Sequence, residues 1–213
     1  MGFIFNFDNN EVVIPVHLKP VNNGTKFKEP KIFPPNIDIK LISDFIIFDL
    51  EPDCIIQNIN ENVIVPNIRE WSIIYVKDIR NIKKSIIKTV IRTFTKYSYA
   101  ESIKLFCDLY EKLNYPYILA HNGYRFDFLI LKANIFRYLD NPEAIYSKFK
   151  FYDSYMFVKE LKIKCKYSNV NIFKKYLKFY KSYNYLIKHQ HKSNADCQML
   201  LLWVNAILRD NKL

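Results

Sequence analysis

The stretch from Phe45 to Glu51, FIIFDLE, constrains the fold most, because an uninterrupted apolar run ends in two carboxylates separated by one residue. Such a run is typical of a strand buried on both faces of a sheet. Side chains two residues apart on a strand project from the same face, so we expect Asp49 and Glu51 to lie side by side. Because adjacent carboxylates repel each other, the pair indicates a bound divalent metal ion or a basic partner. Pro52 and Asp53 follow, and a solvated turn leaving a core strand is the alternative.

Length and composition are those of a soluble globular protein. The chain has 213 residues, enough for one well-packed domain, and 50% of them are hydrophobic and 25% charged. No run of 18 apolar residues occurs and the start, MGFIFNFDNN, lacks the features of a signal peptide, so we expect an intracellular protein of the cytoplasm or nucleus without a membrane partner. The four cysteines are widely spaced, which favours reduced thiols over a zinc site or a disulfide framework.

The order of sequence patterns predicts an α/β fold, a sandwich built around one central mixed β-sheet flanked by helices. Strands are predicted for 45–51, 71–76, 86–94 and 117–120, with an amphipathic helix as the alternative for 86–94. Helices are predicted for 99–113, 126–138 and 196–208, and the first of them has a capping box made by Ser98 and Glu101. We expect an irregular connection over 52–67 and short elements over 151–162 and 170–179.

Almost all of the net charge of +11 comes from one stretch, residues 148–192. This stretch contains twelve lysines, two acidic residues and twelve Phe or Tyr residues. Lysines interleaved with aromatic residues are typical of a groove for single-stranded nucleic acid, in which lysines contact phosphates and rings stack on bases. Lys174, Lys175 and Lys178 are the candidate contacts. The composition bias of an A·T-rich genome is the alternative explanation.

Further acidic residues and a histidine stand at the ends of predicted elements. Asp127 lies at the start of the helix that follows the turn His-Asn-Gly, and Asp196 opens the last apolar helix, with Ser193 or Asn194 available as its cap. A carboxylate favoured by the helix dipole is the alternative for both. His191 precedes Asp196 by five residues, and a neutral imidazole beside metal-bound water is suited to act as a general base.

Three motifs in this order resemble the DEDDh branch of the DEDD superfamily of 3′→5′ exonucleases, which are DnaQ-like proteins with a ribonuclease-H-like fold. The motifs are FDLE, AHNGYRFDFLIL and HKSNAD, and Asp153 in FYDSY resembles the Asp-Ser pair that often follows the second motif. The second motif is most similar to the three-prime repair exonuclease (TREX) group. The resemblance spans about residues 45–208, so we expect a DEDDh exonuclease domain over 41–213. Residues 1–40 have no counterpart and are expected to pack on the core as an N-terminal extension.

The resemblance implies two Mg²⁺ or Mn²⁺ ions about 3.5 to 4 Å apart. Asp49 would bridge both ions, Glu51 and Asp196 would complete the first site, and Asp127 would act at the second, largely through water. A spacing of His, four residues and Asp selects His191 as the base that takes the proton from the attacking water.

The resemblance also places other residues near the substrate. The backbone of Leu50 would approach the terminal nucleotide, Arg125 would contact phosphate and Phe126 would stack on a base. A buried helix anchor is the alternative for Phe126.

The implied activity is hydrolysis from the 3′ end of single-stranded or frayed DNA with release of nucleoside 5′-monophosphates. Three alternatives stay open at this point: a 3′→5′ exoribonuclease of the same fold, a catalytically weak nucleic-acid-binding module, and the proofreading subunit of a polymerase. The expected partner is nucleic acid, most of all single-stranded DNA, and the sequence leaves a homodimer open.

Overall fold

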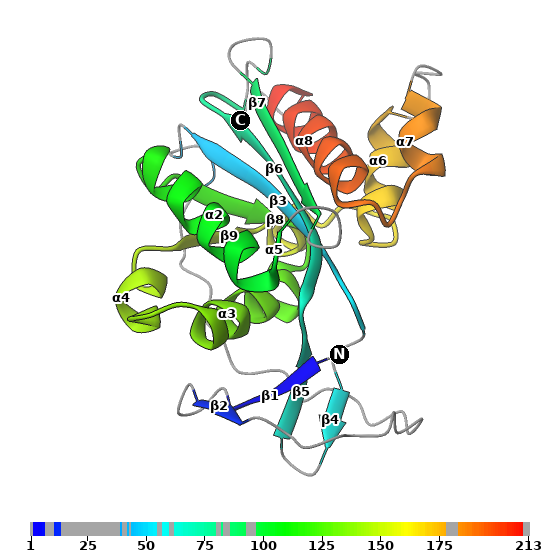
Figure 1. Cartoon of the computed structure of the whole chain (residues 1–213). Coiled ribbons are helices and arrows are strands. Elements are labelled where there is room, and N and C mark those ends of the chain that lie inside the picture. Colours follow the sequence, from blue (N-terminus) through cyan, green and yellow to red (C-terminus); the bar gives the residue numbers. More distant parts are fainter. Residues whose placement is uncertain are drawn as a thin grey trace.

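A five-stranded central sheet has the strand order β7-β6-β3-β8-β9 in the computed structural model of the protein (Figure 1). The structure describes residues 2–6, 11–13, 39, 42, 44–54, 57–59, 62–79, 82, 86–92, 97–177 and 183–210. The strands are β3 (Phe45–Pro52), β6 (Ile68–Val76), β7 (Ile86–Arg92), β8 (Tyr117–Ala120) and β9 (Lys150–Asp153). Strand β6 runs antiparallel to β3 and β7, whereas β8 and β9 run parallel to β3. This order and these directions are those of a ribonuclease-H-like fold, which confirms the predicted fold class.

Strand β3 occupies the middle of the sheet because its apolar residues are buried on both faces. Phe45 and Ile47 belong to one hydrophobic cluster, and Ile46, Phe48 and Leu50 belong to the cluster on the other face. The four apolar side chains before Asp49 are almost fully buried. The alternation that separates the two clusters also sets the direction of the carboxylates at the end of the strand.

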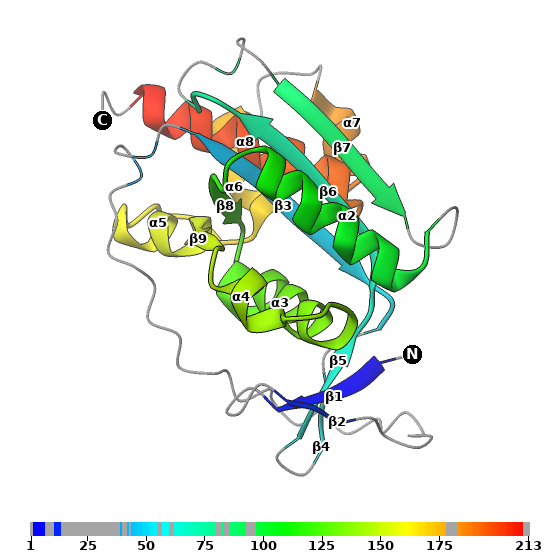
Figure 2. The ribbon, with the colours of Figure 1, turned by 60° about the vertical axis from the view of Figure 1, so that its left-hand side comes forward.

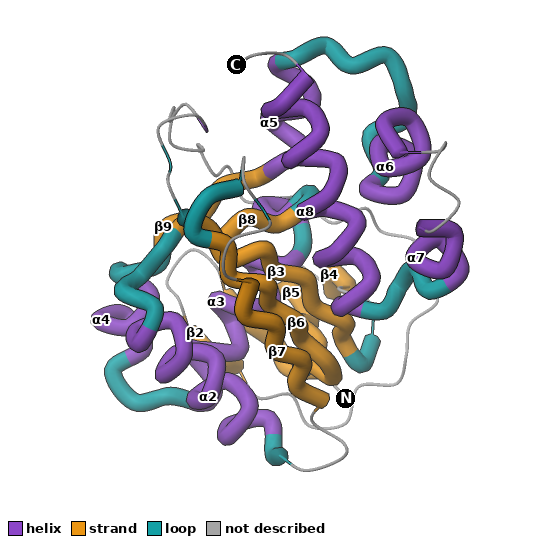
Figure 3. The backbone as a smooth tube through the Cα atoms, turned by 90° about the horizontal axis from the view of Figure 1, so that it is seen from above, coloured by secondary structure: helices purple, strands orange, loops and turns teal. Residues whose placement is uncertain are grey.

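Helices cover both faces of the sheet, as the view from above shows (Figure 3). One face is covered by α2 (Tyr99–Lys112), α3 (Asp127–Tyr138) and α4 (Pro142–Tyr146). The other is covered by α5 (Ser154–Glu160), α6 (Asn169–Leu177), α7 (Asn184–Lys188) and α8 (Ser193–Asp210). The predicted capping box at Ser98 and Glu101 begins α2. No helix in the described part of the chain is long and apolar enough to cross a membrane.

A second sheet corrects the prediction for residues 52–67, where an irregular connection was expected. Its strand order is β2-β1-β5-β4, and its strands are β1 (Gly2–Asn6), β2 (Glu11–Val13), β4 (Gln57–Ile59) and β5 (Asn62–Pro66). The sequence here is rich in Asn, a residue depleted in strands, but β5 gains a partner in β1 from the distant N-terminus. One residue separates β5 from β6, so the second sheet adjoins the central sheet at the end where β3 ends (Figures 1 and 2). The boundary between an N-terminal extension and the main domain stays a prediction.

The four cysteines are free in the structure. Cys197 is buried in α8, and the other three are partly buried. The one group of possible metal ligands in the described part of the chain contains carboxylates alone, without cysteine or histidine.

Candidate metal centre

Three carboxylates from two elements meet where β3 ends. Asp49 and Glu51 come from β3, and Asp196 comes from the first turn of α8. Each offers one oxygen, and the three oxygens lie within 4.8 Å of one another. Each of the three residues is partly buried. The side-by-side placement predicted for Asp49 and Glu51 is therefore present, and α8 adds the third acid.

Asp127 approaches the same strand from the first turn of α3. Pairing between β3 and β8 stops at Ile47 and Leu119, so the backbone N–H of Leu50 has no strand partner on that side. The side chain of Asp127 takes its place, with Oδ1 accepting from the Leu50 N–H at 3.2 Å. Asp127 is 4% exposed. This bond fixes the fourth predicted carboxylate against the segment between Asp49 and Glu51.

Burial and mutual repulsion both make ionisation of the cluster unfavourable. Burial first, and then the charges of its acidic neighbours, raise the pKa of Asp49 well above its usual range. Burial and the charge of Asp196 raise the pKa of Glu51 to about 7, although Arg69 acts in the opposite direction. Burial raises the pKa of Asp127 to about 8 against the effect of the Leu50 N–H bond. The carboxylates therefore lack enough positive charge around them to ionise together at neutral pH.

The donor set fits a hard divalent cation. Carboxylate oxygens are the ligands that Mg²⁺ and Mn²⁺ prefer. A cation among Asp49, Glu51 and Asp196 would offset their repulsion and favour the ionised forms. The arrangement can hold metal at the exit of a rigid strand, with Asp127 close by.

The two histidines of the last motif differ in their relation to the cluster. His191 has a left-handed backbone conformation with φ of 66°, and its N–H donates to Oδ2 of Asp196 at 2.7 Å. Its side chain is exposed. His189 follows α7 and its Nδ1–H donates to the carbonyl of Tyr185 at 2.7 Å. The backbone of His191 thus lies directly against a candidate ligand, whereas the imidazole of His189 is held by α7.

Asn169 is a supporting residue that no sequence pattern singled out. It is the first residue of α6, and its Nδ2 donates to the carbonyl oxygen of Asp196 at 3.0 Å and to Oδ1 at 3.3 Å. Trp203 on α8 fixes Asn169 in turn, because its Nε1–H donates to Oδ1 at 2.7 Å. Together with the N–H of His191, Asn169 leaves each oxygen of the Asp196 carboxylate with one hydrogen-bond donor. This set of contacts restricts the orientation of the carboxylate.

Asp153 organises the turn that leads to Asp127. It is buried at the end of β9 and accepts from the N–H of Asn122 at 2.8 Å and of Tyr124 at 3.1 Å. Between these two lies Gly123, where a Cβ would come within 2.6 Å of the Phe128 ring. The turn therefore requires glycine, and the Asp in FYDSY, which the sequence singled out, supplies its backbone partner.

His121, the first residue of the His-Asn-Gly turn, is a structural histidine. Its Nε2 lies 2.7 Å from the carbonyl of Tyr167, and because a carbonyl accepts, Nε2 carries the proton. Nδ1 then accepts from the hydroxyl of Ser154 at 2.9 Å. Burial lowers the pKa of His121 to about 4, so the imidazole is neutral at physiological pH.

The residues predicted near the terminal nucleotide have different surroundings. The side chain of Leu50 is buried in the core, away from the carboxylates, and its N–H is bonded to Asp127. Arg125 is exposed, and its guanidinium lies 5.6 Å from the centre of the Tyr155 ring. Phe126 is partly buried and packs against the hydrophobic cluster beneath α2 and α3. Their contacts with nucleic acid stay predictions.

The lysines predicted to bind nucleic acid lie on α6 or just beyond it. Lys174 and Lys175 are exposed in the last turn of α6, roughly 8 to 9 Å along the helix from Asn169. Nζ of Lys175 donates to the carbonyl of Lys164 at 3.2 Å. Lys178 lies outside the described residues. Helix α6 therefore connects the surroundings of Asp196 with an exposed basic end.

No known protein family and no curated protein matches the sequence. Among solved structures, the chain is similar to the zinc-bound form of the E. coli ExoI complex with single-stranded DNA, with a TM-score of 0.49 and 13% sequence identity. The similarity covers 80% of this chain and 41% of that chain. The protein thus spans less than half the length of that structure.

Proposed function

We propose that the protein is a DEDDh-type, metal-dependent 3′→5′ exonuclease, most similar to the TREX group, that acts on single-stranded or frayed DNA and releases nucleoside 5′-monophosphates. The observation that carries the proposal is the meeting of Asp49, Glu51 and Asp196 within 4.8 Å. These residues belong to motifs almost 150 positions apart, and a common function explains why they converge. We expect the protein to act inside the cell, in the cytoplasm or the nucleus, and a homodimer remains compatible with this activity.

In this proposal Asp49, Glu51 and Asp196 would hold divalent metal, and Asp127 would help to hold a second ion. When bound, the metal would supply Lewis-acid chemistry that activates water at neutral pH and offsets the charge of the scissile phosphate. The imidazole of His191 would accept the proton of the attacking water, which requires the exposed side chain to turn toward the cluster when substrate is bound.

The same proposal assigns substrate binding to the surroundings of the cluster. Arg125 and the lysines of α6 contact phosphates, which makes affinity depend on salt. Phe126 stacks on a base and the backbone of Leu50 borders the terminal nucleotide. Two observations support this assignment. Arg125 is exposed, and α6 begins beside Asp196, where Asn169 donates to the Asp196 carbonyl.

An assay with 5′-labelled and 3′-labelled oligonucleotides of DNA and RNA, each with Mg²⁺ or with excess EDTA, tests the proposal. The 5′-labelled DNA should shorten stepwise, the 3′-labelled DNA should release labelled mononucleotide at once, and EDTA should stop both reactions. Faster degradation of RNA would identify the exoribonuclease alternative. Binding without degradation in Mg²⁺ and in Mn²⁺ would favour the binding module, and degradation that persists in EDTA would overturn the metal assignment.

A further inference from the structure

Two polar residues of β6 lie directly beside the carboxylate cluster and have no part in the proposed chemistry. In the antiparallel pairing of β3 with β6, Glu70 is opposite Glu51 and Ser72 is opposite Asp49. Opposite residues in such a pair project from the same face of the sheet. Glu70 and Ser72 are therefore neighbours of two candidate ligands, and both are buried.

Ser193, the first residue of α8, connects these two residues with the helix that carries Asp196. It is fully buried, and both its hydroxyl and its backbone N–H donate to Oε1 of Glu70, at 2.6 Å and 3.2 Å. Its Oγ also lies 2.5 Å from Oγ of Ser72, and since the Ser193 proton points to Glu70, Ser72 is the donor in that contact. The three side chains form a continuous buried chain of hydrogen bonds.

The bond between Glu70 and the backbone of Ser193 has a specific physical effect. N–H groups in the first turn of a helix have no partner within the helix, and a carboxylate at that position is favoured by the helix dipole. Glu70 thus attaches the N-terminus of α8 to β6. Asp196 lies three residues, or just under one turn, beyond Ser193, so this attachment sets the distance between Asp196 and the carboxylates of β3.

Glu70 occupies a position where a negative charge is unfavourable. It is 9% exposed and its charge raises the pKa of both Asp49 and Glu51. A buried carboxylate beside other carboxylates requires strong hydrogen bonds, and Ser193 provides two of them.

We propose that Glu70 and Ser193 are positioning residues, a latch that holds the start of α8 on β6 and thereby places Asp196 for metal binding. This inference rests on the proposed function, because it assigns the latch to the metal site. The latch acts through Asp196 and touches neither metal nor substrate.

Titration of the protein with Mn²⁺ by calorimetry tests the latch through metal affinity. Ser193→Ala removes the hydroxyl bond and should weaken Mn²⁺ binding about tenfold, the range expected when a group that orients a ligand is lost. The matched control is Ser102→Ala. Ser102 is also fully buried and accepts from Nε1 of Trp71 on the other face of β6 at 2.8 Å. This control should lower the melting temperature similarly while leaving Mn²⁺ affinity unchanged.

Glu70→Gln separates positioning from direct ligation. The amide oxygen of Gln can still accept from Ser193, so Mn²⁺ affinity should stay within about fivefold of wild type, while Glu70→Ala should weaken binding as Ser193→Ala does. A loss for Glu70→Gln as large as that for Asp49→Asn would make Glu70 a ligand and overturn the latch. The double variant Glu70→Ala/Ser193→Ala should bind Mn²⁺ no more weakly than the single variant that has the lower affinity. Losses of affinity that add up in the double variant would also contradict the proposal.

Two outcomes of the Mn²⁺ titration distinguish a failure of the latch from a failure of the proposed function. Wild-type Mn²⁺ affinity retained in Ser193→Ala would overturn the latch and leave the nuclease proposal intact. A wild-type protein that binds no Mn²⁺ would overturn both.

Discussion

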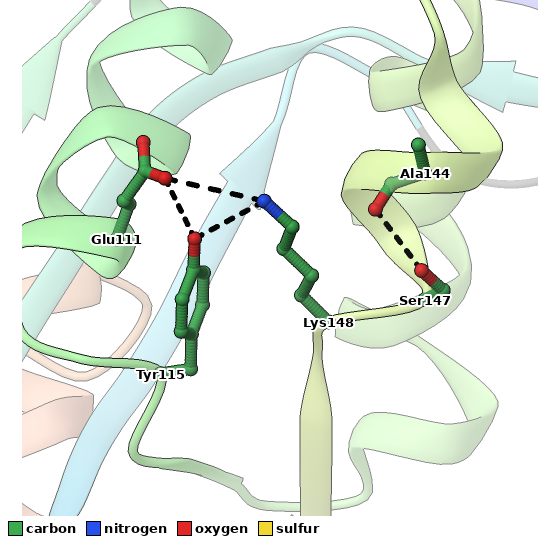
Figure 4. Close-up of polar contacts among 5 residues, drawn as sticks. All are labelled: Glu111, Tyr115, Ala144, Ser147 and Lys148. Atoms are coloured by element: carbon green, nitrogen blue, oxygen red, sulfur yellow. Dashed lines mark hydrogen bonds and ion pairs between the residues drawn. The ribbon is translucent and has the colours of Figure 1, made fainter.

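The two ends of the central sheet carry opposite kinds of polar cluster. Where β8 and β9 begin, Tyr115 donates to Glu111 at 2.7 Å, and Nζ of Lys148 lies 3.2 Å from the Tyr115 hydroxyl and 4.0 Å from Glu111 (Figure 4). Negative and positive groups meet there in an exposed setting. Where β3 ends, Asp49 and Glu51 share a partly buried setting with further acids instead.

The two clusters differ in whether their own members balance their charges. An exposed pair such as Glu111 and Lys148 satisfies its own charges and contributes little to stability. The cluster around Asp49 raises the pKa of its own members, so it lowers the stability of the metal-free fold at neutral pH. A divalent cation bound among these carboxylates would offset this cost.

Replacing one acid at each end should give the largest contrast. Asp49→Asn should lower the rate of mononucleotide release by about 10⁴-fold or more, because the loss of a shared ligand removes several kcal/mol of metal-dependent stabilisation. The matched change at the other end, Glu111→Gln, should leave the rate unchanged. Single-turnover assays in Mg²⁺ measure both, and a rate for Asp49→Asn close to that of Glu111→Gln would remove the functional distinction between the two ends.

The two histidines provide the next contrast. His191→Ala should lower the single-turnover rate by roughly 10² to 10⁴ while affinity for DNA is retained, as expected when a general base is lost. His189→Ala should stay close to wild type, because its imidazole is bonded to the end of α7. Equal rates for His191→Ala and wild type would show that the base lies elsewhere.

Charge reversal of lysines should have a smaller effect that depends on their position. Lys174→Glu/Lys175→Glu should weaken binding of single-stranded DNA about tenfold at low salt and reduce the slope of affinity against salt by about two. Lys104→Glu/Lys112→Glu makes the same change in net charge at exposed sites on α2, outside the lysine-rich stretch, and should have little effect. Fluorescence anisotropy at several salt concentrations compares the two double variants. Equal losses of DNA affinity would show that the lysines of α6 act only through the net charge of the protein.

Local sequence patterns predicted the central strand and the three helices α2, α3 and α8, because each of these elements carries its own signal. The apolar run before Asp49 and the capping box at Ser98 are determined by residues within one element. The pairing of β5 with β1 was missed because it depends on a distant segment, and the Asn-rich sequence before Val63 indicates a loop.

The adjacency of Asp49 and Glu51 was predictable from spacing, whereas the contacts that support the cluster were not. Asp49 and Glu51 are two residues apart on one strand, so their proximity follows from strand geometry. Glu70 meets Ser193 across 123 positions, and Asn169 meets Asp196 across 27. These contacts exist only after the helices pack on the sheet, and neither a serine nor an asparagine at a helix start predicts a partner so far away.

The smallest expected effect is a change in melting temperature with pH, measured without substrate. The pKa of Glu51 is raised to about 7 and that of Asp127 to about 8, above the values in the unfolded chain. The folded state therefore binds more protons, and the free energy of unfolding falls as pH rises toward these values. His121, with a pKa lowered to about 4, acts in the opposite direction but only below about pH 6.5.

Thermal unfolding between about pH 6.5 and pH 8.0, in EDTA and in Mg²⁺, therefore tests most directly whether the carboxylates require a cation. In EDTA the melting temperature should fall by a few degrees as pH rises, and Mg²⁺ should raise it most at the higher pH, where more carboxylates are ionised. A melting temperature that is independent of pH in EDTA and unaffected by Mg²⁺ would contradict the account.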